Sequence, residues 1–274
     1  MHPAPAIDTT AFARDGYLVL RQRIEQARIA AMRAALAAEV DTILGELQRE
    51  GRVNDTRPDL PFERRLCVAR EHAGAHGRSW TDRLAVPATF ALHQDPGLIA
   101  VLHQLLGPVL HGHRQFNVRP KLPGQDLTTV PWHQDTGYYG SQTARDVIIT
   151  AWIPLIEVDG RNGCMQVIPG SHLAGAISHV KANDAGDFLR LETAVDEAQA
   201  VTLAMSPGDV LLMHNLVYHR STDNRSDDIR WSTDLRFWRP DTPSAADLLA
   251  GFPQPWVLEG GPPTTCDTWM SWYQ

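Results

Sequence analysis

The chain of 274 residues has only three cysteines, Cys67, Cys164 and Cys266, which are far apart and show no CxxC spacing. Disulfide frameworks and zinc or iron–sulfur cassettes need paired or closely spaced cysteines, so neither is predicted. Positive charge is also scarce, because 25 Lys and Arg stand against 32 Asp and Glu. Nucleic acids and anionic membranes attract proteins with a positive field, so neither is an expected partner.

Long apolar runs are missing as well. No segment approaches the ~20 apolar residues that span a bilayer. The first residues carry Asp8, Arg14 and Asp15 where a signal peptide would have an apolar stretch. We therefore expect a cytoplasmic location, and the sequence does not indicate an oligomeric state. Hydrophobic residues make up 43% of the chain, which suits one domain over residues 1–274.

The N-terminal part, about residues 1–108, is predicted to be a helical layer. Between Asp8 and Leu20 the pattern predicts a short helix, a break at Gly16 and a strand over YLVL. Apolar residues three and four apart predict a long helix over 24–48. A second helix over 96–106 has Asp95 as its cap and Gly107 as its stop. The polar stretch 50–81 follows no period and is predicted to be a pocket-bordering loop with room for a short helix.

The composition changes over about residues 109–240. Strand-like segments such as DVIITAWIPLIEV and IRWSTDLRFWRP are separated by PG, DG and NG turns, with no long helix between them. Helices first and strands later indicate a mainly β fold, a sandwich or barrel core under a helical N-terminal layer. Residues 241–274 form a C-terminal extension.

The tripeptide HQD occurs twice, at His93 to Asp95 and at His133 to Asp135. In a strand, residues i and i+2 share a face and can close on one metal ion, whereas in a helix they diverge. Asp95 precedes Pro96 and a helix, which favours a capping role. The second copy lies between strand-like segments, so it is the candidate metal site.

An open iron(II) site takes two histidines and one carboxylate, so a third ligand is needed. His214 and His219 are five residues apart and face opposite sides of a regular strand. The polar turn after His219 favours it as the ligand, and His214 remains open as a core or supporting residue. Arg230 begins the next strand and could bind a carboxylate in bidentate fashion. The alternation of polar and apolar residues along this strand also fits a strand with one face toward solvent.

These motifs resemble the phytanoyl-CoA dioxygenase family of iron(II)- and 2-oxoglutarate-dependent oxygenases. The resemblance runs from Phe12 to near Trp238 and is most specific in PWHQD, NGCMQVIPGSH and GDVLLMHNLVYHRSTDNRS. The family's H-x-S-x-x-N-x-S pattern matches from His219, and its cosubstrate arginine, eleven residues on, matches Arg230. The resemblance implies a double-stranded β-helix (jelly-roll, cupin-like) fold and selects His219 over His214.

The resemblance also implies the roles of individual residues. Iron(II) would be held by His133, Asp135 and His219, and the distal carboxylate of 2-oxoglutarate by Arg230 and Ser221. Trp152 matches a tryptophan beside the cosubstrate, and Gln115 occupies a strand position that lines the same pocket, although its identity differs. The implied reaction uses O2 to hydroxylate a small molecule with release of succinate and CO2, and family analogy favours secondary metabolism.

Substrate contacts are less defined by the sequence. Tyr138 and Tyr139 directly follow the ligand pair and are the candidate substrate residues. Arg114, Arg119 and Lys121 fit either an acidic substrate or surface ion pairs. The alternative function is a non-catalytic jelly-roll module that binds a metal or ligand, in which Arg230 and Ser221 would have no reason to lie beside the metal.

Overall fold

The computed structural model describes residues 6–69, 80–124, 129–182, 188–248 and 256–273. Its helices are α1 (Thr9–Asp15), α2 (Gln26–Arg49), α3 (Phe62–Arg65), α5 (Trp80–Arg83), α6 (Pro87–His93), α7 (Pro96–Leu106), α8 (Thr136–Tyr139), α9 (Ala245–Leu248) and α10 (Cys266–Met270). Its strands are β1 (Tyr17–Leu20), β2 (Leu110–Gly112), β3 (Asn117–Lys121), β4 (Ile149–Pro154), β5 (Met165–Ile168), β6 (His179–Lys181), β7 (Leu189–Leu191), β8 (Val201–Leu203), β9 (Val210–His214), β10 (Tyr218–Ser221), β11 (Arg230–Trp238) and β12 (Trp256–Glu259). None of the helices within these ranges is long and apolar enough to cross a membrane.

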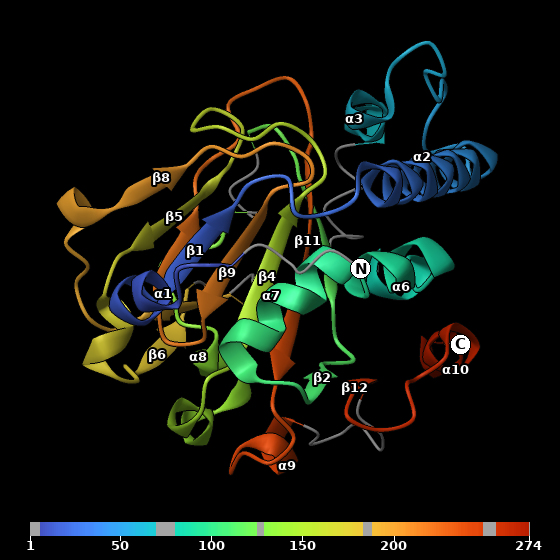
Figure 1. Cartoon of the computed structure of the whole chain (residues 1–274). Helices are drawn as coiled ribbons and strands as arrows, with labels where there is room; N and C mark the ends of the chain where they lie inside the picture. Colours follow the sequence, from blue (N-terminus) through green and yellow to red (C-terminus); the bar gives the residue numbers. More distant parts are fainter. Residues whose placement is uncertain (1–5, 70–79, 125–128, 183–187, 249–255, 274) are drawn as a thin grey trace.

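Two antiparallel sheets form the centre of the molecule (Figure 1). The major sheet has the order β1-β9-β4-β11-β2-β12, with β3 also paired to β11. The minor sheet has the order β10-β5-β8, and β6 and β7 form a separate ribbon. Helices α2 and α6 lie on the opposite side of the major sheet from β5 and β8 (Figure 1). This arrangement confirms the predicted mainly β jelly-roll core with a helical N-terminal layer.

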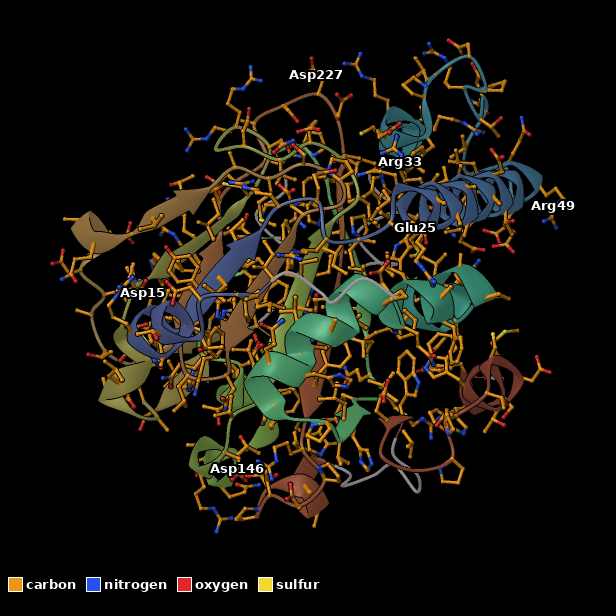
Figure 2. All side chains as sticks on the ribbon, viewed as in Figure 1. Asp15, Glu25, Arg33, Arg49, Asp146 and Asp227 are labelled. Carbon is orange, nitrogen blue, oxygen red and sulfur yellow. The ribbon has the colours of Figure 1, made fainter. Side chains whose placement is uncertain are left out.

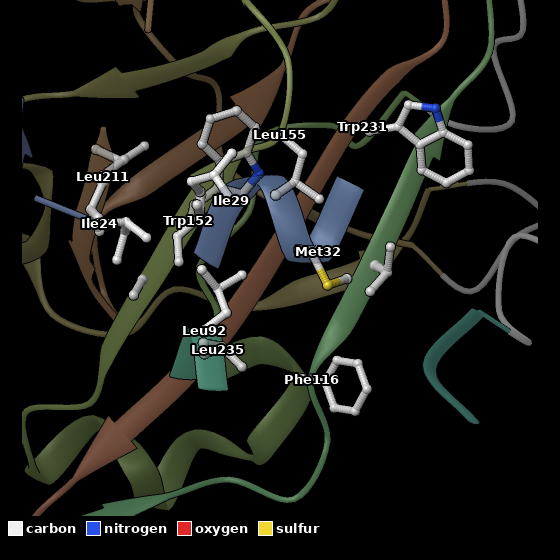
Figure 3. Packing of buried hydrophobic residues seen from close by; sticks show 14 of the residues in the cluster. Ile24, Ile29, Met32, Leu92, Phe116, Trp152, Leu155, Leu211, Trp231 and Leu235 are labelled. Carbon is white, nitrogen blue, oxygen red and sulfur yellow. The ribbon is translucent and has the colours of Figure 1, made fainter. Parts of the chain in front are cut away.

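The long helix α2 covers the major sheet, with the labelled Glu25 and Arg49 near its two ends (Figure 2). Its buried residues repeat at helical spacing and are Ile29, Met32, Leu36, Val40, Ile43, Leu44 and Leu47. Ile29 and Met32 belong to the same hydrophobic cluster as Trp231 of β11 and Leu155, the residue that follows β4 (Figure 3). Full burial of each such aliphatic side chain contributes about 1.5–3 kcal/mol, so this face fixes the helical layer to the sheet.

Most of the predicted elements are present. The helix over 96–106 begins at the Asp95 cap, as expected, and α1 ends at Gly16, whose φ of 78° suits glycine. Stretch 50–81 holds only the short turns α3, η1 (Leu66–Ala69) and α5; its residues 70–79 lie outside the described residues. Helix α6 was not predicted, because seven residues are too few to show a helical period.

The strands at the two ends of the chain join the core strands. β1 pairs with β9, and β12, from the predicted C-terminal extension, pairs with β2. One hydrophobic cluster runs from Phe12 to Trp269. The layers assigned to residues 1–108, 109–240 and 241–274 are therefore interleaved, and the assignment of all 274 residues to one domain stays a prediction.

Register decides which side chains of the major sheet face the minor sheet. Paired residues of antiparallel strands share a face, and Asp234 of β11 pairs with Trp152 of β4 and Asn117 of β3. The same face also carries Arg230, Ser232, Arg236, Arg119, Lys121 and Thr150. All nine residues of β11 are buried, so the polar alternation of this strand does not come from a solvent-facing side.

Candidate metal centre

His133, Asp135 and His219 lie together in the structure. Their candidate ligand atoms are all within 4.8 Å of one another, and the three side chains are buried. Nε2 of His133 and Nε2 of His219 each lie 3.7 Å from Oδ1 of Asp135. Two imidazoles and a carboxylate that converge in this way can hold one divalent metal ion.

A backbone bridge joins the two histidines. The N–H of His133 donates to the carbonyl of His219 at 3.0 Å, and the N–H of His219 donates back at 3.1 Å. The side chains of such a pair share a face, and the two ring centroids are 4.1 Å apart. The two histidines therefore lie at the edge of the minor sheet that β10 forms.

Each histidine is oriented by a carbonyl group. Nδ1 of His133 lies 2.9 Å from the carbonyl oxygen of Pro131, and Nδ1 of His219 lies 3.0 Å from that of Val217. Because a carbonyl can only accept, both Nδ1 atoms carry the hydrogen and both Nε2 lone pairs are left for a metal. Burial, aided by His133, lowers the pKa of His219 to about 4, so its ring is neutral at pH 7.

The carboxylate of Asp135 is held in its ionised form. Burial alone would raise its pKa, but Arg236 and the two histidines keep the pKa of Asp135 well below its usual range. The hydroxyl of Thr150 donates to Oδ2, while Nη2 of Arg236 lies 3.6 Å from Oδ1. A neutral His219 and an ionised Asp135 are the forms in which these two side chains bind a metal.

The prediction that His133 and Asp135 share one face of a strand was wrong. His133 lies in an isolated bridge, and Asp135 has a helical backbone (φ −61°, ψ −31°) at the start of α8. Both HQD copies therefore end where a helix begins. They differ in the carboxylate, because Asp135 makes no capping hydrogen bond, whereas Asp95 accepts from Gly97 and Leu98 N–H.

The first HQD copy is structural, as predicted. Oδ2 of Asp95 accepts from the N–H of Glu25 at 3.0 Å, so this carboxylate ties α7 to the start of α2. His93 is fully buried against the rings of Phe116 and Trp256. It forms no ligand cluster with other described residues.

Arg230 is buried on the inner face of β11 without a carboxylate partner among the described residues. Nη1 donates to the Oγ of Ser232 at 2.5 Å, and the guanidinium lies 5.5 Å from the centre of the Trp152 ring. Its Nε is buried and has no hydrogen-bond partner. Burial lowers the pKa of Arg230 to about 10, so it stays charged at pH 7. A buried unpaired cation is costly, and a carboxylate ligand would remove that cost.

Lys121 lies beside Arg230 and contacts Ser221. The Oγ of Ser221 accepts from Nζ of Lys121 at 2.9 Å and from the N–H of Val130 at 3.1 Å. Lys121 pairs with Arg230 across β3 and β11 and is 1% exposed. The sequence did not place Lys121 here, because only the register brings it to this face. Burial lowers the pKa of Lys121 to about 6.

Gln115 does not occupy the predicted strand position. It lies two residues before β3 and its side chain is exposed. Its backbone contacts the Nδ1 atom of His113, so the prediction that Gln115 lines the cosubstrate pocket from a strand is wrong. The residues of β3 that do face the site are Asn117, Arg119 and Lys121.

The two tyrosines lie beside the centre. Tyr138 is 42% exposed, and its ring lies 5.5 Å from the ring of His133. Its hydroxyl oxygen accepts a hydrogen bond from the N–H of Leu189. The guanidinium of Arg236 lies 6.0 Å from the centre of the partly buried Tyr139 ring. Both side chains can therefore border a substrate, and their role stays a prediction.

His214 lies outside the three-residue cluster. The segment predicted as one strand is divided into β9 of the major sheet and β10 of the minor sheet. His214 ends β9, its Nδ1 accepts from the N–H of Leu216 and its ring lies 5.1 Å from that of His172. The prediction that His214 and His219 face opposite sides of one strand therefore does not apply, because the two residues lie on strands of different sheets.

Sequence reasoning did not identify an ion-pair network next to the centre. Asp234 contacts both Arg236 and Arg119, and Arg236 also approaches Asp135. The alternating charges of β11 were the only sequence signal, because the partner Arg119 comes from another strand.

Comparison with known proteins places these observations in a family. The family model described as "Phytanoyl-CoA dioxygenase (PhyH)" matches residues 12–232. A probable phytanoyl-CoA dioxygenase of Caenorhabditis elegans is 25% identical over 163 residues, covering 57% of this chain and 52% of that protein. A 1-deoxypentalenic acid 11-beta-hydroxylase of Streptomyces arenae is 27% identical over 176 residues, covering 60% of this chain and 61% of that protein.

The solved structures support the fold. The epimerase SnoN in complex with Fe3+, alpha ketoglutarate and nogalamycin RO has a TM-score of 0.57 and 20% sequence identity, covering 94% of both chains. The aligned part spans only about half to three fifths of the length of the two curated relatives named above. The family model, in contrast, covers most of this chain. The chain therefore belongs to the phytanoyl-CoA dioxygenase (PhyH) family.

Proposed function

We propose that this protein is an Fe(II)- and 2-oxoglutarate-dependent dioxygenase that hydroxylates a small molecule. The observation that carries the proposal is the buried His133, Asp135 and His219 cluster, together with the Arg230 cation on the facing sheet, which has no carboxylate partner among the described residues. Two imidazoles and one carboxylate fit Fe(II) and leave coordination positions open. When bound, iron, 2-oxoglutarate and O2 supply C–H oxidation, with release of succinate and CO2.

The protein's residues have separate tasks in this proposal. His133, Asp135 and His219 hold the iron, and Arg230 with Ser221 binds the distal carboxylate of 2-oxoglutarate. Trp152 lies against the Arg230 guanidinium and limits where it can point. Orientation of the cosubstrate by fixed groups is the protein's main contribution to such chemistry.

Tyr138 and Tyr139 are proposed to contact the substrate from α8. The relatives support secondary metabolism as the setting, since one is named as a hydroxylase of 1-deoxypentalenic acid and the solved epimerase binds nogalamycin RO. A cytoplasmic location is proposed with it.

The test is an anaerobic titration of the metal-free protein with Fe(II) and then 2-oxoglutarate. Bidentate binding of the cosubstrate to the iron should produce a weak visible charge-transfer band, and O2 should then release succinate. The competing function, a binding module without turnover, would take up metal but give no band. That result with folded, iron-loaded protein would overturn the proposal.

A further inference from the structure

Asp234 holds two arginines in fixed positions beside the metal centre. Its Oδ1 accepts from Nδ2 of Asn117 at 2.8 Å and from Nη1 of Arg236, and its Oδ2 accepts from Nε of Arg119 at 2.7 Å. Asp234 is 2% exposed and Arg236 is 7% exposed. One buried carboxylate thus orients two guanidinium groups, which we call the arginine pair.

Several donors of the arginine pair are unused. Nε of Arg236 is buried without a hydrogen-bond partner in the described part of the chain, and its Nη2 is 3.6 Å from Oδ1 of Asp135, beyond a normal hydrogen bond. Arg119 donates to Asp234 through its Nε, and its side chain is 35% exposed. The pair therefore runs from the buried metal centre to the surface and can bind a group that enters there.

The charges of the site indicate which kind of chemical group the arginine pair can bind. With iron and 2-oxoglutarate bound, the two charges of Fe(II) and the one of Arg230 balance Asp135 and the two carboxylates of the cosubstrate. The arginine pair then has only Asp234 against it, so one positive charge remains. A positive charge in a largely buried site is stabilised by an anionic partner. Lys121 does not reverse this balance, because burial lowers its pKa to about 6.

We infer that the substrate carries a carboxylate or similar monoanionic group, which Arg236 and Arg119 bind next to the metal centre. This inference rests on the proposed function and specifies its substrate class. Tyr138 lies against His133 and Tyr139 against Arg236, so both tyrosines lie beside groups of the metal centre. A guanidinium fork suits a carboxylate because two parallel hydrogen bonds fix its orientation. The anion would thereby hold one end of the substrate while another part faces the iron.

The competing explanation is that the arginine pair only ties β3 to β11. In that case both guanidinium groups would bind only Asp234, and the protein would show no preference for anionic ligands. The two explanations differ in binding, so the test does not depend on turnover.

The experiment uses the full-length protein, loaded anaerobically with Fe(II) and 2-oxoglutarate. Butanoate, hexanoate and octanoate are titrated, each beside its neutral primary amide, while the charge-transfer band is followed. The carboxylates should perturb the band without removing it and should bind at least about tenfold more tightly than the amides, the size expected for one charge-assisted contact. Equal binding of acid and amide, no saturable response to any carboxylate, or loss of the band through displacement of 2-oxoglutarate would each overturn the inference.

Variants assign the effect to the arginine pair. Arg119→Gln, which leaves the contact between Arg236 and Asp135 in place, should keep the band of the iron and 2-oxoglutarate complex and lose most of the preference for carboxylates. Arg236→Gln should lose the preference too, and its Fe(II) content is measured alongside because Arg236 also approaches Asp135. Arg239→Gln is the matched control, because Arg239 follows the same strand but is half exposed and pairs with Asp241; it should bind like the wild type. If Arg119→Gln keeps the full preference for carboxylates, the pair does not bind substrate.

The outcome separates this inference from the proposed function. A wild-type protein that forms no band would overturn the proposed function and the inference with it. A wild-type band with no preference for carboxylates would overturn the inference alone.

Discussion

The two faces of β11 are equally buried and chemically opposite. One face carries Trp231, Leu235 and Phe237 and belongs to the apolar core under the helical layer. The other carries Arg230, Ser232, Asp234 and Arg236 and faces the metal centre. Burial alone therefore does not make a strand face apolar. A buried face remains polar where its side chains bind one another or a ligand.

This difference predicts that the two faces respond differently to substitution. Changes on the helix side should reduce the free energy of unfolding and leave the binding of metal and cosubstrate intact in the molecules that fold. Changes on the metal side should do the reverse. The following substitutions test this difference between the two faces.

The largest effect is expected at the metal ligands. His219→Ala removes one of the three ligands, so Fe(II) should bind weakly and the band with 2-oxoglutarate should disappear. His214→Ala is the matched control, since His214 lies outside the cluster, and it should keep the band with a modest loss of stability. Metal content and the visible spectrum measure both, and the reverse result would mean that the ligand assignment is wrong.

The helix side should respond next. The Trp231 ring lies 4.9 Å from the ring of Trp80 and is fully buried, so Trp231→Ala should lower the free energy of unfolding by about 3–5 kcal/mol. Denaturant unfolding of the metal-free protein measures this loss. Ser232→Ala, one residue along and on the other face, should cost far less. Equal losses for the two variants would contradict the comparison.

Arg230 should affect the cosubstrate more than the metal. Arg230→Ala removes a charged hydrogen-bond donor, a loss of about 1.5–3 kcal/mol in binding of 2-oxoglutarate, or roughly tenfold to 150-fold. Fe(II) affinity should stay nearly unchanged. Band titrations at fixed Fe(II) give the 2-oxoglutarate affinity, and an unchanged value would remove Arg230 from the cosubstrate site.

The last prediction concerns acid sensitivity, whose effect on stability stays small near pH 6 and grows only as the pH falls further. Burial, and secondarily His172, lowers the pKa of His214 to about 4, below the unfolded value of about 6.5. The unfolded chain then binds the extra proton, so the stabilisation is present above about pH 6.5 and is lost as the pH falls toward 4. His214 should contribute a slope of about 1.4 kcal/mol per pH unit inside that window. Unfolding of the metal-free protein and of His214→Asn should show this difference, and parallel pH curves would argue against it.

Much of the local structure was readable from the sequence. Apolar spacing predicted α2, and Asp95 with Pro96 predicted the start of α7, because these features act within one or two turns of helix. Helix α6 and the division between β9 and β10 were missed. Both depend on packing with distant segments, which no local period records.

The sequence by itself determined the residue types of the site. The HQD motif, the pattern that begins at His219 and the position of Arg230 implied a metal-binding set and a cosubstrate arginine through their resemblance to a known family. Only the tertiary structure decided their geometry. The bridge between His133 and His219 and the helical backbone at Asp135 bring the three groups together.

The same distinction explains what was missed around the site. Gln115 was predicted to face the pocket, but the register and start of β3 leave it exposed and bring Lys121 and Arg119 inward instead. Strand register is set by contacts between residues far apart in the chain. The sequence therefore determined which chemistry is available, and the pairing of β3, β4 and β11 decided which side chains reach the metal centre.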